Sequence, residues 1–172
     1  MPFWRPSERG RLARCSAAAG VPRFVFLSSI KVNGESTRPG ECFRPDDTPR
    51  PQDAYGLSKL EAETGLRRIA EGSGMELVII RPPLVHGPGA KANFAAMVRW
   101  LQRGWPLPLG AVVNNRRSLV SLDNLVDLIV TCMTHTAAPG RIFLVSDGED
   151  LSTAQLLHRL GRALGRPARM FP

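Results

Sequence analysis

The chain has 172 residues, of which 43% are hydrophobic, and a net charge of +8 at pH 7. This length allows a domain with a buried core, and this hydrophobic content excludes an intrinsically disordered chain. No apolar run is as long as the roughly 18 residues that a membrane-spanning helix needs, and the opening residues lack the apolar region of a signal peptide. We therefore expect a globular protein without a membrane partner.

The positive charge comes almost entirely from arginine, because Lys31, Lys59 and Lys91 are the only lysines. The arginines are scattered and accompany no recognised nucleic-acid-binding module, so a solvated surface is the first interpretation and anionic small ligands such as nucleotides the second. The three cysteines are widely spaced, which argues against a disulfide framework and for a reducing cytoplasm. The three histidines lack metal-ligand spacing, so we expect no metal site.

The first third of the chain predicts one helix, one strand and one loop. A helix over residues 9–19 ends at Gly20. The apolar run Phe24-Val25-Phe26-Leu27 opens a strand over residues 23–29 and is typical of a strand buried on both faces of a parallel sheet. A polar, proline-rich loop covers about residues 31–51.

The pattern then continues with a helix over about residues 53–71 and a second buried strand over residues 77–80. The later predicted elements are a helix over residues 92–103, an extended piece over 106–110, a helix over 122–134, a strand over 141–146 and a helix from the capping box of Ser152 and Gln155 to about Leu164. Strand, helix and strand in one sheet imply a parallel crossover. The alternation predicts an α/β fold whose ligands bind beyond the carboxyl ends of the strands.

Tyr55 and Lys59 are four residues apart and therefore lie on one face of the predicted helix. A nearby cation makes a phenol easier to ionise. Ser28 and Ser29 end the first predicted strand, and a hydroxyl there can complete a proton-transfer site for a sugar or alcohol hydroxyl. Taken alone, the tyrosine and the lysine could equally be an ordinary pair on an amphipathic helix.

Four segments together carry a resemblance to a known family: Phe26–Gly34 (FLSSIKVNG), Tyr55–Lys59 (YGLSK), Arg81–Gly89 (RPPLVHGPG) and Arg117–Leu125 (RSLVSLDNL). In this order and spacing they resemble the extended short-chain dehydrogenase/reductase family, and within it the NAD-dependent nucleotide-sugar epimerases, dehydratases and reductases. The resemblance runs from about residue 10 to the end. It implies a partial Rossmann-like, doubly wound parallel sheet with part of a small C-terminal substrate domain.

The resemblance also implies a domain division and a set of roles. Residues 1–86 would be the C-terminal part of the NAD-binding domain and residues 87–172 mostly substrate-binding, with the segment 117–146 packing back on the Rossmann sheet. Tyr55 would be the general acid/base, Lys59 would supply positive charge and hold the cofactor ribose, and Ser29 would hydrogen-bond the reacting oxygen. The cofactor would be NAD, with NADP as the alternative, and would supply the hydride chemistry.

Further contacts are implied only by the resemblance. The cofactor-binding residues would be Ser28, Tyr55, Lys59, Pro82 and Val85. The residues that bind the nucleotide-sugar substrate would be Ser29, Leu84, Asn93, Phe94, Pro108, Leu109 and Arg117. Among these, the arginine would bind the diphosphate, because a guanidinium fork suits phosphate oxygens.

The chain departs from the family pattern in three places. Asn33 stands where a tyrosine is usual, which is expected to alter the substrate pocket, and Leu84 stands where an asparagine is frequent. No glycine-rich GxxGxxG or GxGxxG motif precedes the first strand. We therefore expect an N-terminally truncated chain, from a truncated gene or a mis-called start, that binds NAD(P) weakly or not at all by itself.

The leading interpretation of function is a nucleotide-sugar 4-epimerase that acts on a UDP-hexose or UDP-N-acetylhexosamine for a surface polysaccharide. A 4-keto-nucleotide-sugar reductase would use the same three residues and is the close alternative. From another class, the chain could be an inactive remnant without cofactor binding, which leaves its status as an enzyme open. An arginine-rich RNA binder ranks last. The resemblance also implies a homodimer, because members of this family often dimerise through two helices per subunit, one of them the helix of Tyr55 and Lys59.

Overall fold

The computed structural model describes residues 6–88, 93–107, 109 and 112–171, which form two compact units. The first unit takes its residues from Met1–Pro83 and Leu125–Val145, and the second from Leu84–Asn124 and Ser146–Pro172. The segment 117–146, which was expected to pack back on the first sheet, takes part in both units. Its residues up to Asn124 belong to the second unit and the following ones, through Val145, to the first.

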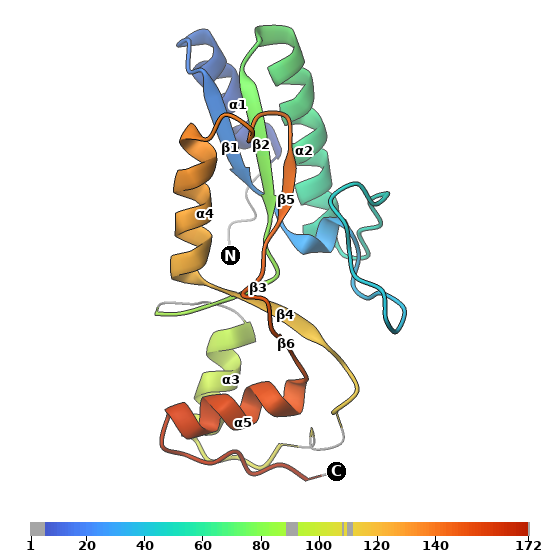
Figure 1. Cartoon of the computed structure of the whole chain (residues 1–172), viewed down its shortest axis with the longest axis vertical. Coiled ribbons are helices and arrows are strands. Elements are labelled where there is room, and N and C mark those ends of the chain that lie inside the picture. Colours follow the sequence, from blue (N-terminus) through green and yellow to red (C-terminus); the bar gives the residue numbers. More distant parts are fainter. Residues whose placement is uncertain (1–5, 89–92, 108, 110–111, 172) are drawn as a thin grey trace. The chain divides into compact units, whose positions relative to one another are not determined.

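A three-stranded parallel sheet forms the centre of the first unit (Figure 1). Its strands are β1 (Arg23–Leu27), β2 (Glu76–Arg81) and β5 (Ile142–Leu144), in the order β1-β2-β5. Strand β2 is central and buried from its second residue to its last. A strand with neighbours on both sides and helices on both faces has no polar face, which explains its continuous apolar run. The predicted α/β class and the parallel pairing of the first two strands are confirmed.

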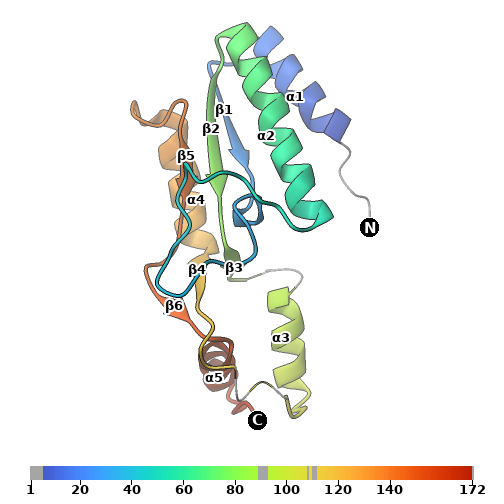
Figure 2. The ribbon, with the colours of Figure 1, turned by 90° about the vertical axis from the view of Figure 1, so that its right-hand side faces the viewer.

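Helices cover both faces of this sheet. Figure 2 shows α1 (Pro6–Ala18) and α2 (Ala54–Ser73) on one face of β1 and β2, and α4 (Leu122–Thr134) on the other. The core between the sheet and the first two helices consists of buried apolar side chains: Ala13, Phe26, Ala62, Leu66, Met75, Leu77 and Ile79. Removal of these side chains from water is the main favourable term in holding the layers together.

Helix α2 has a capping residue at each end. The Asp53 side chain accepts a 2.6 Å hydrogen bond from Gly56 N, as an N-cap residue does. Gly74 ends the helix with φ of +72°, a left-handed conformation that glycine adopts at little cost. Strand β1 ends at Leu27, two residues earlier than expected, so Ser28 and Ser29 lie just beyond the strand. A short 3-10 helix, η1 (Ile30–Val32), follows them in what was expected to be loop.

The second unit has its own small sheet, in the order β3-β4-β6. Strand β3 (Leu84–His86) is parallel to β4 (Arg117–Ser121), which is antiparallel to β6 (Asp150–Leu151). The sequence did not predict these strands, because they have two to five residues and mixed polarity. Helices α3 (Asn93–Gln102) and α5 (Thr153–Ala163) belong to the same unit. The capping box of Ser152 and Gln155 is present at the start of α5, as predicted.

Two leucine-rich clusters hold the second unit. One has Leu101, Leu107 and Leu157 at its centre, and the other has Leu119, Leu151 and Leu156. Of the extended piece expected over residues 106–110, Pro108 and Gly110 lie outside the described residues, and Leu107 forms a parallel bridge with Met170. Among the helices of the described ranges, none combines the length and the apolar character needed to cross a bilayer.

Candidate functional site

Tyr55 and Lys59 lie on the first turns of α2, beside the carboxyl end of β1. Lys59 Nζ donates a 2.8 Å hydrogen bond to the carbonyl oxygen of Leu27, the last residue of β1. The same ammonium nitrogen lies 5.7 Å from the ring centroid of Tyr55 and 5.2 Å from that of Phe26. Tyr55 is 46% exposed, so its ring is not in the apolar interior. The arrangement presents a phenol to solvent with a cation next to it.

Ser29 follows two residues after the carbonyl group that Lys59 binds. Its backbone is extended, with φ of −159° and ψ of 148°, and it is the N-cap of η1. Its hydroxyl oxygen accepts a hydrogen bond from Lys31 N at 3.3 Å, and the residue is 9% exposed. A serine hydroxyl that accepts one hydrogen bond still carries a proton that it can donate. The fold thus places a lysine and a serine at one strand end, as the sequence predicted for this strand.

Two of the predicted cofactor contacts in the first unit are buried. Ser28 is 3% exposed, and its hydroxyl donates a 2.5 Å hydrogen bond to Glu63 Oε1. Pro82 is also buried, and its carbonyl oxygen accepts a 3.0 Å hydrogen bond from Ile30 N. The Ser28 side chain therefore faces the protein, and a cofactor role for either residue stays a prediction.

A buried ion pair that the sequence analysis did not identify lies directly beneath Ser28. Arg81 Nε lies 2.9 Å from Glu63 Oε1 and Arg81 Nη2 lies 2.6 Å from Glu63 Oε2, a two-pronged contact. Arg81 Nη1 donates a third hydrogen bond, 3.0 Å long, to Asn33 Oδ1. Glu63 and Arg81 are each 2% exposed. The signal was available, because Glu63 follows Lys59 by one helical turn and a charge at the end of a buried strand needs a partner.

Four of the predicted substrate contacts are described in the second unit with their side chains, and three of them are informative. Leu84, on β3, packs against the cluster of Leu119, Leu151 and Leu156. The ring centroid of Phe94 lies 6.1 Å from that of His86, which ends β3. Arg117 opens β4 and is exposed, as a phosphate-binding arginine would have to be.

The other predicted cofactor and substrate contacts of the second unit say less about a binding site. Val85 pairs with Val120 within the sheet. Leu109 packs against the cluster that surrounds Leu101. Asn93 begins α3, but its side chain lies outside the described residues, as does the whole of Pro108.

A second polar cluster, also missed from the sequence, surrounds Asp147. Its carboxylate accepts hydrogen bonds from Asn124 Nδ2 at 2.8 Å and from Ser121 N at 2.9 Å, and His86 Nε2 lies 2.9 Å from it. The bond from Asn124, followed by the contact with His86 and the bond from Ser121, lowers the pKa of this carboxyl group against a smaller opposing effect of burial. The cluster fixes the start of α4 to the ends of β3 and β4.

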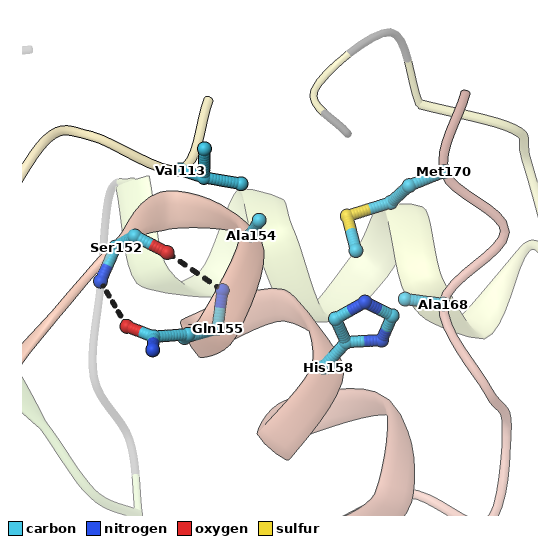
Figure 3. A pocket seen from close by; sticks show the side chains of 7 residues that line it. All are labelled: Val113, Ser152, Ala154, Gln155, His158, Ala168 and Met170. Carbon is cyan, nitrogen blue, oxygen red and sulfur yellow. Dashed lines mark hydrogen bonds between the residues drawn. The ribbon is translucent and has the colours of Figure 1, made fainter. Parts of the chain in front are cut away.

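A shallow pocket lies among the described residues of each unit. The pocket of the second unit has a volume of about 320 Å³ and is shown in Figure 3, where the capping box of Ser152 and Gln155 lies on one side and His158 and Met170 lie on the other. The pocket of the first unit has about 330 Å³ and lies over the ion pair of Glu63 and Arg81. Ser29, Tyr55 and Lys59 line neither of these two pockets. In the part of the chain that the structure describes, no three His, Cys, Asp or Glu side chains gather as a metal site would require.

Comparison with known proteins assigns this fold and site to a family. A sequence model of the NAD dependent epimerase/dehydratase family matches residues 9–146. The chain is 53% identical over 161 residues to a UDP-glucose 4-epimerase of Vibrio cholerae, a match that covers 94% of this chain and 49% of that protein.

Two solved structures share the fold. The UDP-glucuronic acid 4-epimerase of Bacillus cereus, in complex with UDP-glucuronic acid and NAD, matches with a TM-score of 0.82 and 20% identity over 95% of this chain and 52% of its own. The UDP-glucose 4-epimerase of Thermus thermophilus, in complex with NAD, matches with a TM-score of 0.78 and 22% identity over 95% of this chain and 55% of its own.

At such identities the structural matches show the fold alone, and they confirm the expected Rossmann-like architecture. The chain spans about half the length of the relatives it matches. The family match covers most of the chain and includes the strand, the helix and the serine that form the candidate site. The chain therefore belongs to the NAD dependent epimerase/dehydratase family.

Proposed function

We propose that this chain carries the acid–base site of an NAD-dependent nucleotide-sugar 4-epimerase that acts on a UDP-hexose or a UDP-N-acetylhexosamine. The observation that carries the proposal is the hydrogen bond from Lys59 Nζ to Leu27 O. That bond holds the ammonium group beside Tyr55 and two residues from Ser29, at the end of the strand where ligands of such sheets bind. A relative that is 53% identical is a UDP-glucose 4-epimerase, which supports this activity over others of the family.

Each residue of the proposed site has a defined task. Tyr55 takes the proton of the sugar C4 hydroxyl in the oxidation step and returns a proton in the reduction step. Lys59 places a positive charge beside the phenol. Ser29 donates its hydroxyl proton to the reacting oxygen, which holds that oxygen next to the phenol while the sugar turns over.

The described residues fit one part of NAD. Lys59 is anchored at a strand end next to an exposed phenol, an arrangement that can receive a ribose and a nicotinamide. NAD, when bound, supplies the hydride acceptor and donor that the epimerisation requires. No glycine-rich phosphate-binding motif occurs in the 172 residues. We therefore propose that this chain by itself binds NAD weakly or not at all, which titration of the purified chain with NAD will measure.

Three further expectations belong to the same proposal. A location in the cytoplasm agrees with three cysteines in the free form. A role in making a surface polysaccharide would follow from a nucleotide-sugar substrate. A homodimer through α2 would cover the exposed Leu57, which lies beside Tyr55 in the sequence.

The test uses a hybrid enzyme, in which this chain replaces the 161-residue matching segment of the Vibrio cholerae relative. Incubated with UDP-hexoses and UDP-N-acetylhexosamines and with catalytic NAD, the hybrid is expected to interconvert the C4 epimers without added NADPH. Replacement of Tyr55 by Phe is expected to lower kcat by about 10²- to 10⁴-fold, the usual share of general acid–base catalysis. Ser73→Ala, at the far end of α2, is the matched control and should leave kcat unchanged.

The alternatives give different results in the same assay. Oxidation of NADPH by a 4-keto-nucleotide sugar, without epimer exchange, would favour the reductase. A hybrid that folds and binds NAD but turns over no nucleotide sugar would contradict the proposal and favour an inactive remnant.

A further inference from the structure

The segment from Ser28 to Asn33, called here the serine segment, carries Ser29 between β1 and the following loop. Its backbone is tied to the end of β2, because Ser28 N donates to Ile80 O at 2.7 Å and Ile30 N donates to Pro82 O at 3.0 Å. These two bonds lie on either side of Ser29. The position of the Ser29 hydroxyl is therefore set by how firmly the two ends of the serine segment are held.

Asn33 holds the far end of the serine segment. It is 3% exposed, its Oδ1 accepts a 3.0 Å hydrogen bond from Arg81 Nη1, and its Nδ2 donates a 2.8 Å hydrogen bond to Arg44 O. The departure from the family's usual tyrosine was expected to alter the substrate pocket. That effect stays a prediction; the Asn33 side chain itself lies in the interior of the first unit, bonded to Arg81 and to the loop after η1.

The near end is held through the same arginine. Ser28 donates to Glu63, and Glu63 makes the two-pronged contact with Arg81. One ion pair therefore binds both ends of the serine segment, Ser28 through its carboxylate and Asn33 through its guanidinium. Among the described residues, every buried side-chain nitrogen and oxygen has a hydrogen-bond partner, so the network has no spare group. Loss of one member leaves another unsatisfied in the interior.

We propose that Asn33 is a positioning residue for Ser29. It acts through Arg81 and never touches the substrate, and the catalytic consequence rests on the proposed function, in which Ser29 holds the reacting oxygen. Asparagine suits this position because it offers both an acceptor for Arg81 and a donor for Arg44 O. The hydrogen bond between Asn33 and Arg81 keeps the Ser29 hydroxyl in one place, and its loss lets the serine segment sample others.

Two variants that keep the branched shape and the number of heavy side-chain atoms of asparagine separate this role from general stability. Asn33→Leu removes both hydrogen bonds and leaves Arg81 Nη1 without its acceptor. Asn33→Asp keeps an oxygen for Arg81 and loses the donor to Arg44 O, and it is the rescue variant because the proposal assigns the positioning role to the bond with Arg81. Ser73→Ala removes a 2.7 Å hydrogen bond to Ile69 O at the other end of α2 and serves as the matched control in the same unit.

The first measurement is amide hydrogen exchange in the 172-residue chain, which does not depend on activity. In Asn33→Leu the amides of Ile30 and Val32 are expected to exchange about tenfold faster, as for a buried donor left unpaired, while Val78 in β2 keeps its rate. Asn33→Asp should return both rates to within about threefold of the original. Unchanged rates at Ile30 and Val32, or equal acceleration at all three amides, would overturn the proposal.

The second measurement is steady-state kinetics of the hybrid enzyme. Asn33→Leu is expected to lower kcat about tenfold with KM within about twofold, since a misplaced group costs orientation rather than binding. Asn33→Asp should recover most of kcat. A lowered melting temperature with unchanged kcat would show a purely structural role and contradict the proposal. If the unsubstituted hybrid is inactive, the proposed function fails, and hydrogen exchange still decides whether Asn33 holds the serine segment.

Discussion

The ammonium group of Lys59 and the carbonyl oxygen of Leu27 are joined by a 2.8 Å hydrogen bond between a helix and the end of a strand. Residues 27 and 59 are far apart in the chain, and this bond is what makes them parts of one site. It fixes the lysine at the carboxyl end of β1, where Ser28 and Ser29 follow directly. The phenol of Tyr55, one helical turn before the lysine, shares that position.

Replacement of Lys59 by Met tests this bond. The variant removes the ammonium group from Leu27 O and from Tyr55 while it keeps a long apolar stem on the helix. We expect kcat of the hybrid enzyme to fall by about 10²-fold or more, the lower range for loss of acid–base function. Arg68→Met, which removes an exposed cation from the same helix, is the control and should change kcat by less than about twofold. If the two variants had comparable activity, Lys59 would not be part of the catalytic site.

Replacement of Glu63 by Gln tests the buried ion pair. The variant leaves the Arg81 charge buried without its carboxylate, so we expect the free energy of unfolding to fall by about 3–5 kcal/mol. Glu76→Gln is the matched control, because its partner Arg23 is reached at 2.7 Å but the Glu76 side chain is 44% exposed. That pair should contribute at most about 1 kcal/mol. Urea denaturation followed by circular dichroism measures both losses, and equal losses would mean that water reaches the pair of Glu63 and Arg81.

Much of the first unit followed from the sequence because its elements are long and periodic. The buried runs of β1 and β2 and the helix of Tyr55 and Lys59 each carry a strong pattern, and the structure places them as expected. Strand β4 is the central strand of the second sheet, but it was missed because its polar Arg117 and Ser118 precede Leu119 without a regular alternation. Its partner strands, β3 and β6, are distant in the chain, so no local sequence pattern indicates the pairing.

The candidate site also combines a spacing that the sequence shows with contacts between residues that are distant in the chain. The spacing of Tyr55 and Lys59 is a helical repeat and can be seen in the sequence. The ion pair joins residues 18 positions apart, and the bond of Arg81 to Asn33 joins residues 48 apart. Such pairs depend on how the strands are ordered in the sheet. Asn33 is an example, because the sequence showed only that a usual tyrosine is missing and gave no sign of the bonds of Asn33 to Arg81 and to Arg44 O.

The Asp147 cluster makes a pH-dependent contribution to stability. The hydrogen bond from Asn124, and then the contact with His86, lowers the pKa of this carboxyl group in the folded chain. In the unfolded chain it titrates near the ordinary value of about 3.9. The stabilisation is therefore present above about pH 4 and is lost as the pH falls through the lower, folded pKa.

Carbon-13 chemical shifts of the Asp147 carboxyl group against pH measure this directly. The midpoint is expected below the ordinary aspartate value of about 3.9. In Asn124→Ala, which removes the first cause of the shift, the midpoint should move up towards that value. As a control, Asn115→Ala should leave it in place, because Asn115 is bonded to Thr153 at the start of α5. A midpoint at or above the ordinary value would show that the cluster does not form in solution.

Two glycines of α2 test how closely the helix approaches the serine segment. A Cβ atom at Gly56 would lie 2.8 Å from Lys31 O and 3.1 Å from Pro51 Cβ, whereas a Cβ at Gly65 would meet nothing within 4 Å. Alanine favours a helix over glycine by about 1 kcal/mol, so Gly65→Ala should stabilise the chain by about that amount. Gly56→Ala gains the same propensity but must push the helix from the backbone of η1, at a cost of about 1–3 kcal/mol.

The two changes in stability are expected to have opposite signs, although both substitutions add one methyl group to the same helix. Urea midpoints of the two variants should therefore move in opposite directions. Gly56→Ala should also lower kcat of the hybrid enzyme, since the methyl group would part Tyr55 from the serine segment, whereas Gly65→Ala should leave kcat unchanged. If both variants were equally stabilised, the gap between η1 and α2 would be wide enough for a methyl group. The close approach of α2 to the serine segment would then not depend on a glycine at position 56.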